Sequence, residues 1–84
     1  MTIVFSDHAW EDYLYWQDND PKILARINVL IKEIQRTPFS GIGKPQPLKY
    51  ALKSYWSRRI TDEHRIVYSI SGDLLMLAQI RHHY

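Results

Sequence analysis

The clearest periodic stretch of the sequence runs from residue 20 to residue 37 and reads DPKILARINVLIKEIQRT. Its large apolar residues recur at steps of three and four, which places them on one face of a helix. They are Ile23, Leu24, Ile27, Leu30, Ile31 and Ile34. Asp20 is a suitable N-cap with Pro21 at the first helical position, and a helix rarely continues into a residue such as Pro38. The stretch therefore predicts an amphipathic helix that buries its apolar face in the core.

The segments on either side of this helix predict an α+β fold. Residues 2–5 form a β-branched and aromatic run typical of a strand, and Ser6 can cap a helix that follows it. Four further strand-like runs lie downstream, at residues 48–52, 55–60, 65–70 and 74–80. Short polar turns separate the last three runs, as in hairpins. We therefore expect an N-terminal strand and two helices packed on an antiparallel β-sheet.

The segment between the second helix and the downstream strands reads TPFSGIGKPQP, residues 37–47. Three prolines and two glycines predict a loop. Eleven residues is long for a connection in a small domain, and loops of that length tend to be functional or disordered. The prolines on either side of Gln46 stiffen the segment, which favours a functional loop.

Length and composition exclude several classes of protein. Eighty-four residues, 45% of them hydrophobic and 24% charged, predict one globular domain over 1–84. Cysteine is absent, so a disulfide framework, a zinc finger and a thiol redox site are excluded, and a reducing cytoplasm is the expected location. No apolar run approaches the roughly 18–20 residues of a membrane span, and the start of the chain lacks a basic signal-peptide region. We expect a soluble protein without a membrane partner.

Charge is distributed unevenly along the chain. Residues 1–43 carry a net charge of −2, whereas residues 44–84 carry +4. A basic second half suggests an anionic partner, with nucleic acid as the first candidate. An ordinary solvated surface explains the charge equally well, so charge alone does not decide between them.

Basic and aromatic residues alternate in the second half of the chain. The set comprises Lys49, Lys53, Arg58, Arg59, Arg65, Arg81, His82 and His83, with Tyr50, Tyr55, Trp56, Tyr68 and Tyr84 between them. Cations that hold phosphates and rings that stack on unpaired bases are the usual means of binding single-stranded RNA. For any one residue the simpler interpretation is a core aromatic or a solvated arginine. The set as a whole favours an anion-binding face of the sheet, opposite the one that Ile66 and Tyr68 share.

The last two residues, His83 and Tyr84, have two interpretations. Terminal residues commonly fray. Alternatively, the apolar run at 74–80 is an internal strand that places an imidazole and a phenol at its end, where a histidine can donate or accept a proton near neutral pH. We interpret His8 and His64 as structural. A metal site is not expected, because adjacent histidines leave a strand on opposite faces and no carboxylate is spaced to complete a ligand set.

Several blocks of the sequence together resemble the YoeB family of bacterial toxins, within the RelE-like superfamily, over essentially the whole chain. The blocks lie at residues 10–16, 36–39, 43–45, 47–49, 55–60, 63–65 and 81–84, the last reading Arg-His-His-Tyr. The resemblance implies a RelE-like fold and an mRNA endonuclease that acts in the ribosomal A site without metal or cofactor. It also implies a YefM-type antitoxin as partner, operator DNA only through the antitoxin complex, and a homodimer.

The resemblance also implies roles for individual residues. In the family's reaction the ribose 2′-hydroxyl attacks the adjacent phosphate and the 5′-oxygen leaves, which calls for a base, an acid and a cation. On this pattern His83 is the acid and Arg65 stabilises the charge on the phosphate. Lys49 and Arg59 orient the RNA backbone, and Tyr84 positions or stacks a base.

At Gln46 the sequence departs from the family, which carries a glutamate there as general base. An amide can hydrogen-bond the 2′-hydroxyl but cannot take its proton at neutral pH. Either the chain is a weakened variant, natural or made deliberately, or His83 or another group supplies the base; we favour the weakened variant. A catalytically silent module that binds the ribosome or joins a repressor complex is the alternative function, and a ribosome-independent ribonuclease is a third.

Overall fold

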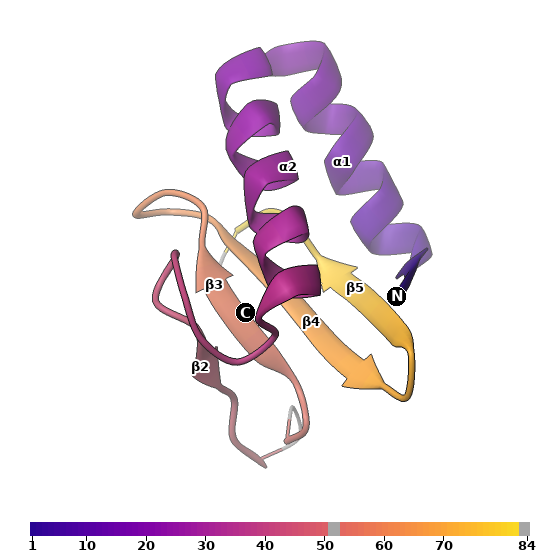
Figure 1. Cartoon of the computed structure of the whole chain (residues 1–84). Coiled ribbons are helices and arrows are strands. Elements are labelled where there is room, and N and C mark those ends of the chain that lie inside the picture. Colours follow the sequence, from indigo (N-terminus) through magenta and orange to yellow (C-terminus); the bar gives the residue numbers. More distant parts are fainter. Residues whose placement is uncertain (51–52, 83–84) are drawn as a thin grey trace.

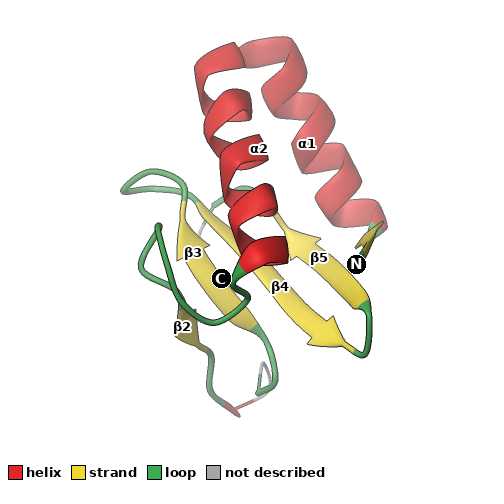
Figure 2. Ribbon diagram, in the orientation of Figure 1, coloured by secondary structure: helices red, strands yellow, loops and turns green. Residues whose placement is uncertain are grey.

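The computed structural model describes residues 1–50 and 53–82. Within them two helices and five strands follow one another along the chain (Figure 1): β1 (Thr2–Phe5), α1 (Asp7–Asn19), α2 (Pro21–Arg36), β2 (Gln46–Pro47), β3 (Trp56–Arg59), β4 (Arg65–Ser71) and β5 (Leu74–Gln79). The strands form one sheet in the order β1-β5-β4-β3-β2. Both helices lie on one side of this sheet (Figure 2). The predicted α+β architecture, with an N-terminal strand and two helices on a sheet, is confirmed.

The sheet is mixed, because the N-terminal strand joins an otherwise antiparallel sheet in parallel. Strands β2 to β5 are antiparallel neighbours, but β1 pairs with β5 in parallel, with Thr2 opposite Leu74. A parallel pair needs a long crossover connection, and here the whole chain between β1 and β5 supplies it. As a result β5 is an internal strand, as predicted for the segment that leads to the C-terminus.

Helix α2 matches its prediction at both ends. The Asp20 side chain accepts hydrogen bonds from the backbone N–H groups of Lys22 and Ile23, and Pro21 is the first helical residue. Its apolar face supplies Ile27, Leu30, Ile31 and Ile34 to the core. The sheet completes this core with Ile66, Tyr68, Leu75 and Leu77, and Ile80 follows directly after β5. Each such apolar side chain contributes roughly 1.5–3 kcal/mol when it leaves water, so this helix is a main source of stability.

A strand was expected at residues 48–52. The described part of this range, residues 48–50, is not a strand, so the prediction is wrong there. Strand β2 comes earlier, at Gln46–Pro47, inside the segment predicted as a loop. Leu48 still donates its N–H to the carbonyl of Tyr55, but Tyr50 then has a φ of 59° and Lys53 N–H closes a turn onto its carbonyl. A left-handed residue ends a strand, because it reverses the direction of the backbone. Residues 51 and 52 lie outside the described part.

No helix in the described part of the chain is long and apolar enough to cross a membrane.

Candidate active site

Two arginines face each other on the side of the sheet away from the helices. Arg59 on β3 and Arg65 on β4 are register partners, and the next pair along, Arg58 with Ile66, belongs to the helix side. Side chains alternate along a strand, so Arg59 and Arg65 emerge together on the side away from the helices. Opposed residues of an antiparallel pair have Cβ atoms about 4.5–5.5 Å apart, where like charges repel. An anion bound between the two guanidinium groups would relieve that repulsion.

Gln46 lies on the same side of the sheet. It is the register partner of Ser57, which is two residues from Arg59 on β3 and is itself opposite Val67. Strand geometry puts the Cα atoms of Gln46 and Arg59 about 8 Å apart. Gln46 is exposed, while the Ser57 hydroxyl is fully buried and has no hydrogen-bond partner among the described residues. The structure therefore brings Gln46, Arg59 and Arg65 to the face of the sheet away from the helices, where the neighbouring Ser57 and Val67 are buried.

The other predicted site residues are placed differently. Lys49 is exposed and lies beyond the end of β2, so it has no strand register to the arginine pair. His83 and Tyr84 lie outside the described residues. The chain reaches them from His82, whose carbonyl accepts a hydrogen bond from Arg65 N–H at 3.1 Å. His82, the last described residue, is thus hydrogen-bonded to the backbone of Arg65.

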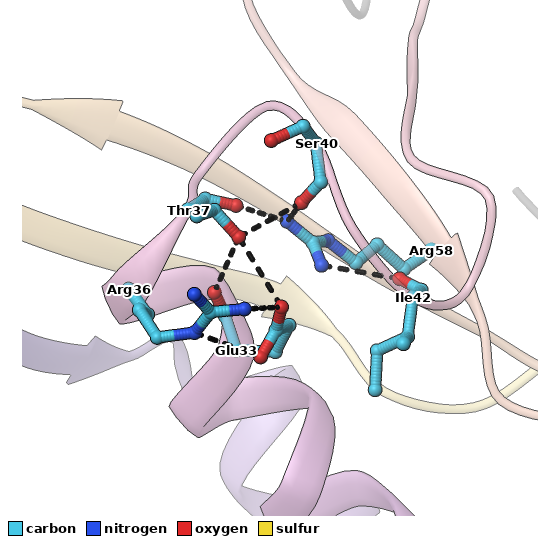
Figure 3. A network of polar contacts seen from close by, with 6 residues as sticks. All are labelled: Glu33, Arg36, Thr37, Ser40, Ile42 and Arg58. Carbon is cyan, nitrogen blue, oxygen red and sulfur yellow. Dashed lines mark hydrogen bonds and ion pairs between the residues drawn. The ribbon is translucent and has the colours of Figure 1, made fainter.

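Arg58 was expected with the other basic residues on the anion-binding face, and this expectation is wrong. It is completely buried on the helix side of β3. Its guanidinium donates hydrogen bonds to the carbonyls of Thr37, Ser40 and Ile42, which form the start of the loop before β2 (Figure 3). A cation is stable in this position because several carbonyl oxygens converge on it. Its role is to hold the loop, and its charge is not available to RNA.

Tyr68 completes the network around Arg58. Its hydroxyl accepts from Arg58 Nε at 3.2 Å and donates to the carbonyl of Pro38 at 2.7 Å. Burial raises the pKa of the Tyr68 phenol above its ordinary value, although the nearby Arg58 opposes the shift. The phenol therefore keeps the proton that it donates to Pro38. The core interpretation of Tyr68 is correct, and its ring is not available for stacking on a base.

The loop held by this network leads to β2 and so to Gln46, on the side of the sheet away from the helices. On the solvent side of the network, Glu33 is paired with Arg36 and also contacts Thr37 (Figure 3). Further along, the carbonyl of Gly43 accepts the N–H of Arg59 at 2.7 Å. Three residues later the chain enters β2 at Gln46. Arg58 therefore fixes the loop on one side of β3, and the same loop bonds to Arg59 next to it.

Another group of residues, which was not predicted from the sequence, surrounds the end of β5. Asp12 and Trp16 of α1 are both buried and hydrogen-bond the backbone of Ile80. His64, interpreted only as structural, accepts the N–H of His82 through Nδ1 at 2.8 Å. Arg81 lies over the ring of Tyr15, 3.5 Å from its centre, and so is also turned toward α1. These partners are 18 to 68 residues apart in the sequence, and no local pattern marks them.

The described residues contain no cluster of three or more histidine, aspartate or glutamate side chains that could hold a metal ion.

Comparisons with known proteins give a consistent result. A family model described as the YoeB-like toxin of bacterial type II toxin–antitoxin systems matches residues 5–84. Toxin YoeB of Escherichia coli strain K12 is 54% identical over 84 residues, which cover all of both chains. A solved YoeB/ParE toxin from Agrobacterium tumefaciens superposes with a TM-score of 0.98 at 49% identity, and all of both chains is covered.

A third relative, YoeB of Staphylococcus aureus, has been solved in two assemblies. The YoeB dimer superposes with a TM-score of 0.93, and the heterotetrameric YoeB–YefM toxin–antitoxin complex with 0.92. In both cases the identity is 46%, and the match covers 100% of this chain and 98% of the other.

Proposed function

We propose, since this chain belongs to the family of YoeB-like toxins of bacterial type II toxin–antitoxin systems, that it is an mRNA endonuclease acting on the ribosome. The whole of 1–84 would be a single RelE-like toxin domain. The observation that best supports the proposal is the arginine pair, Arg59 opposite Arg65, on the face that also carries Gln46. Two arginines in register on one face of a sheet suit a phosphate whose negative charge increases in the transition state.

The proposed reaction needs no metal or cofactor. The 2′-hydroxyl of one ribose loses its proton and attacks the adjacent phosphorus, and the bond from phosphorus to the 5′-oxygen breaks. A general acid protonates the leaving 5′-oxygen, so that the products are a 2′,3′-cyclic phosphate and a free 5′-hydroxyl. Arg65 would stabilise the phosphorane-like charge, with Arg59 and Lys49 orienting the backbone. His83 would supply the proton and Tyr84 would position a base.

Position 46 determines how active this chain is. A glutamate there could accept the 2′-hydroxyl proton, whereas the amide of Gln46 can only hydrogen-bond that hydroxyl. A general base contributes typically 10²–10⁴-fold to a rate. We therefore propose that the chain retains RNA positioning and charge stabilisation but works at a rate reduced by about that factor.

The proposed partners follow from the family. A YefM-type antitoxin would neutralise the toxin, as the Staphylococcus aureus complex suggests by analogy, and the dimer of that relative supports a homodimer here. The ribosome and the mRNA in its A site would be the targets. Operator DNA would be reached only through the antitoxin complex. The cytoplasm is the compartment in which these partners meet.

The decisive experiment compares the chain with its Gln46→Glu variant on translating ribosomes, with mRNA ends mapped by primer extension. The proposal expects cuts in the A-site codon, with Gln46→Glu faster by about 10²–10⁴-fold. A Gln46→Met variant controls for the shape of the side chain and should be no faster than the chain itself. If the Gln46→Glu variant makes no cut in the A-site codon, the proposed endonuclease activity is refuted.

Gln46 also favours a second candidate, a catalytically silent module that occupies the ribosome or joins its antitoxin in a repressor complex. The same basic face would serve either use. Ribosome binding by Gln46→Glu without new mRNA ends would support this candidate. Rapid cutting of naked single-stranded RNA would instead point to a ribosome-independent ribonuclease.

A further inference from the structure

The three residues after β5 are held mainly by side chains, with one backbone hydrogen bond from β4. The backbone N–H of Ile80 donates to Asp12 Oδ2 and its carbonyl accepts from Trp16 Nε1, both at 2.9 Å. The carbonyl of Arg81 accepts from the Gln79 side chain at 2.8 Å. Backbone groups outside a ladder need such partners when they are buried. The segment 80–82 therefore has a fixed path although it is not a strand.

His64 supplies the last of these contacts. Its Nδ1 accepts the N–H of His82, and the carbonyl of His82 accepts the N–H of Arg65. His64 lies in the turn between β3 and β4, where its carbonyl accepts from Ile60 N–H at 2.9 Å. Both polar backbone groups of His82 are thus bonded to one rigid hairpin, the one that carries the arginine pair.

The imidazole of His64 is itself oriented by the core. Its ring lies edge-on to Trp16, with centres 4.8 Å apart and planes at 80°. Trp16 is buried and also binds the carbonyl of Ile80, so the same indole fixes both the histidine and the segment that it contacts. Because Nδ1 accepts a hydrogen bond, the neutral ring carries its proton on Nε2, an assignment from the hydrogen-bond network.

His82 adopts a conformation that needs this support. Its φ is 65°, in the left-handed region that costs a non-glycine residue roughly 1–2 kcal/mol. Such strain persists only where surrounding contacts impose it, and it is concentrated at functional sites. Here it turns the backbone at the residue directly before His83. Loss of the His64 contact would let the backbone of His82 relax from this conformation.

We propose that His64 is a positioning residue, which fixes the backbone of His82 beside Arg65 and so aids the alignment of the acid proposed at position 83. This inference rests on the proposed function, because it assigns to His64 the alignment of the acid named there. A donor that must approach the leaving oxygen closely gains from being held in advance, and a displacement of 1 Å can cost about 10²-fold in rate.

The test uses two substitutions of His64 that place a side-chain amide oxygen at different distances from Cβ. In His64→Asn the amide oxygen occupies nearly the position of Nδ1, two bonds beyond Cβ, and can still accept from His82. In His64→Gln the amide lies one carbon further out and cannot. Both are made in the Gln46→Glu chain, with Glu63→Gln, an exposed substitution in the same turn, as the control. Single-turnover cleavage is measured against ribosome concentration, and exchange of the His82 amide hydrogen is followed by NMR.

We expect His64→Gln to lower the saturating cleavage rate by about 10–100-fold, with an unchanged half-saturating ribosome concentration and faster exchange at His82. His64→Asn should recover most of the rate and the protection, and Glu63→Gln should leave the saturating rate unaltered. Equal rates in Asn and Gln variants, or a rate unaffected by faster exchange at His82, would overturn the positioning role alone. An inactive Gln46→Glu parent would overturn the proposed function, and this role with it.

Discussion

Arg59 and Arg65 stand directly opposite each other on antiparallel strands, two like charges on one face of the sheet. Arg59 Nη1 has an exposed carboxylate, Asp62, at 3.7 Å, and an exposed ion pair contributes at most about 1 kcal/mol. This arrangement works against folding, and the RNA phosphate proposed to bind there would offset the repulsion. Because the two charges repel, removal of either arginine should affect RNA cleavage or RNA binding without lowering the stability of the fold.

Truncation of Arg65 to alanine should abolish most cleavage without loss of stability. We expect a fall of about 10²–10³-fold in the saturating rate, the usual size for one group that stabilises transition-state charge. Thermal unfolding should show unchanged or slightly higher stability, because the repulsion with Arg59 is removed. Arg59→Ala should mainly weaken RNA binding and reduce its salt dependence by about one phosphate contact. Equal effects of both variants on rate and binding would contradict the division of roles.

Substitution of buried Arg58 should cost far more stability than substitution of exposed Arg36. Arg58→Met leaves the carbonyls of Thr37, Ser40 and Ile42 without their donor in a buried place, at an expected cost of about 3–5 kcal/mol. Arg58→Lys should recover little, because an ammonium cannot reproduce the planar fork. Arg36→Met, the matched control at the exposed end of α2, should cost far less, because an exposed ion pair contributes little to stability. Urea denaturation measures all three, and a small loss for Arg58→Met would show that the loop is held by other contacts.

The contrast between Arg58 and Arg59 shows where sequence reasoning ends. The alternation of side chains along β3 predicts that one of two adjacent arginines faces the helices, but a cation is the residue least expected there. Its burial depends on carbonyls 16 to 21 residues away, which only the folded loop brings together. Helix α2, in contrast, was predictable because its apolar period, its cap and its terminating proline are all local.

The candidate site was predictable to a similar extent. Alternation along β4 places Arg65 opposite the face of Ile66 and Tyr68, and the structure confirms this placement. The contacts of His64 and Asp12 with residues 80–82 could not be predicted, because they join a turn and a helix to the end of the chain with no periodic signal. The roles of all the proposed site residues stay predictions, and His83 and Tyr84 also lie outside the described residues.

Acid should weaken the outer part of the loop network through Glu33. The hydrogen bond from Arg36, followed by its charge, holds the pKa of Glu33 below the ordinary value of 4.5, and burial opposes the shift only in part. A lowered native pKa means that this contribution to stability is present above pH 4.5 and is lost as the pH falls through the native value. We therefore expect Glu33→Gln to lose less stability than the parent on acidification. Urea midpoints across this range measure the difference, and Arg36→Met should flatten the same acid limb.

Replacement of Gly43 by alanine tests whether the loop before β2 is tightly packed against β3. Gly43 has a φ of 82°, and an added Cβ would lie 2.9 Å from Leu30 Cδ2, 3.1 Å from Arg58 Cβ and 3.3 Å from the carbonyl of Arg59. Left-handed strain of roughly 1–2 kcal/mol and overpacking of roughly 1–3 kcal/mol should add, and the loop must move away from β3.

Gly72→Ala is the matched control for this substitution. Gly72 also has a positive φ, 57°, but an added Cβ there would meet nothing within 4 Å, so only the backbone strain remains. We expect Gly43→Ala to be the more destabilising by about 1–3 kcal/mol in urea denaturation. Because the Gly43 carbonyl bonds to Arg59 N–H and the loop leads to Gln46, the Gly43→Ala chain carrying Gln46→Glu should also cleave more slowly than its Gly72→Ala counterpart. Equal stability and equal rates would mean that the loop yields without moving the arginine pair.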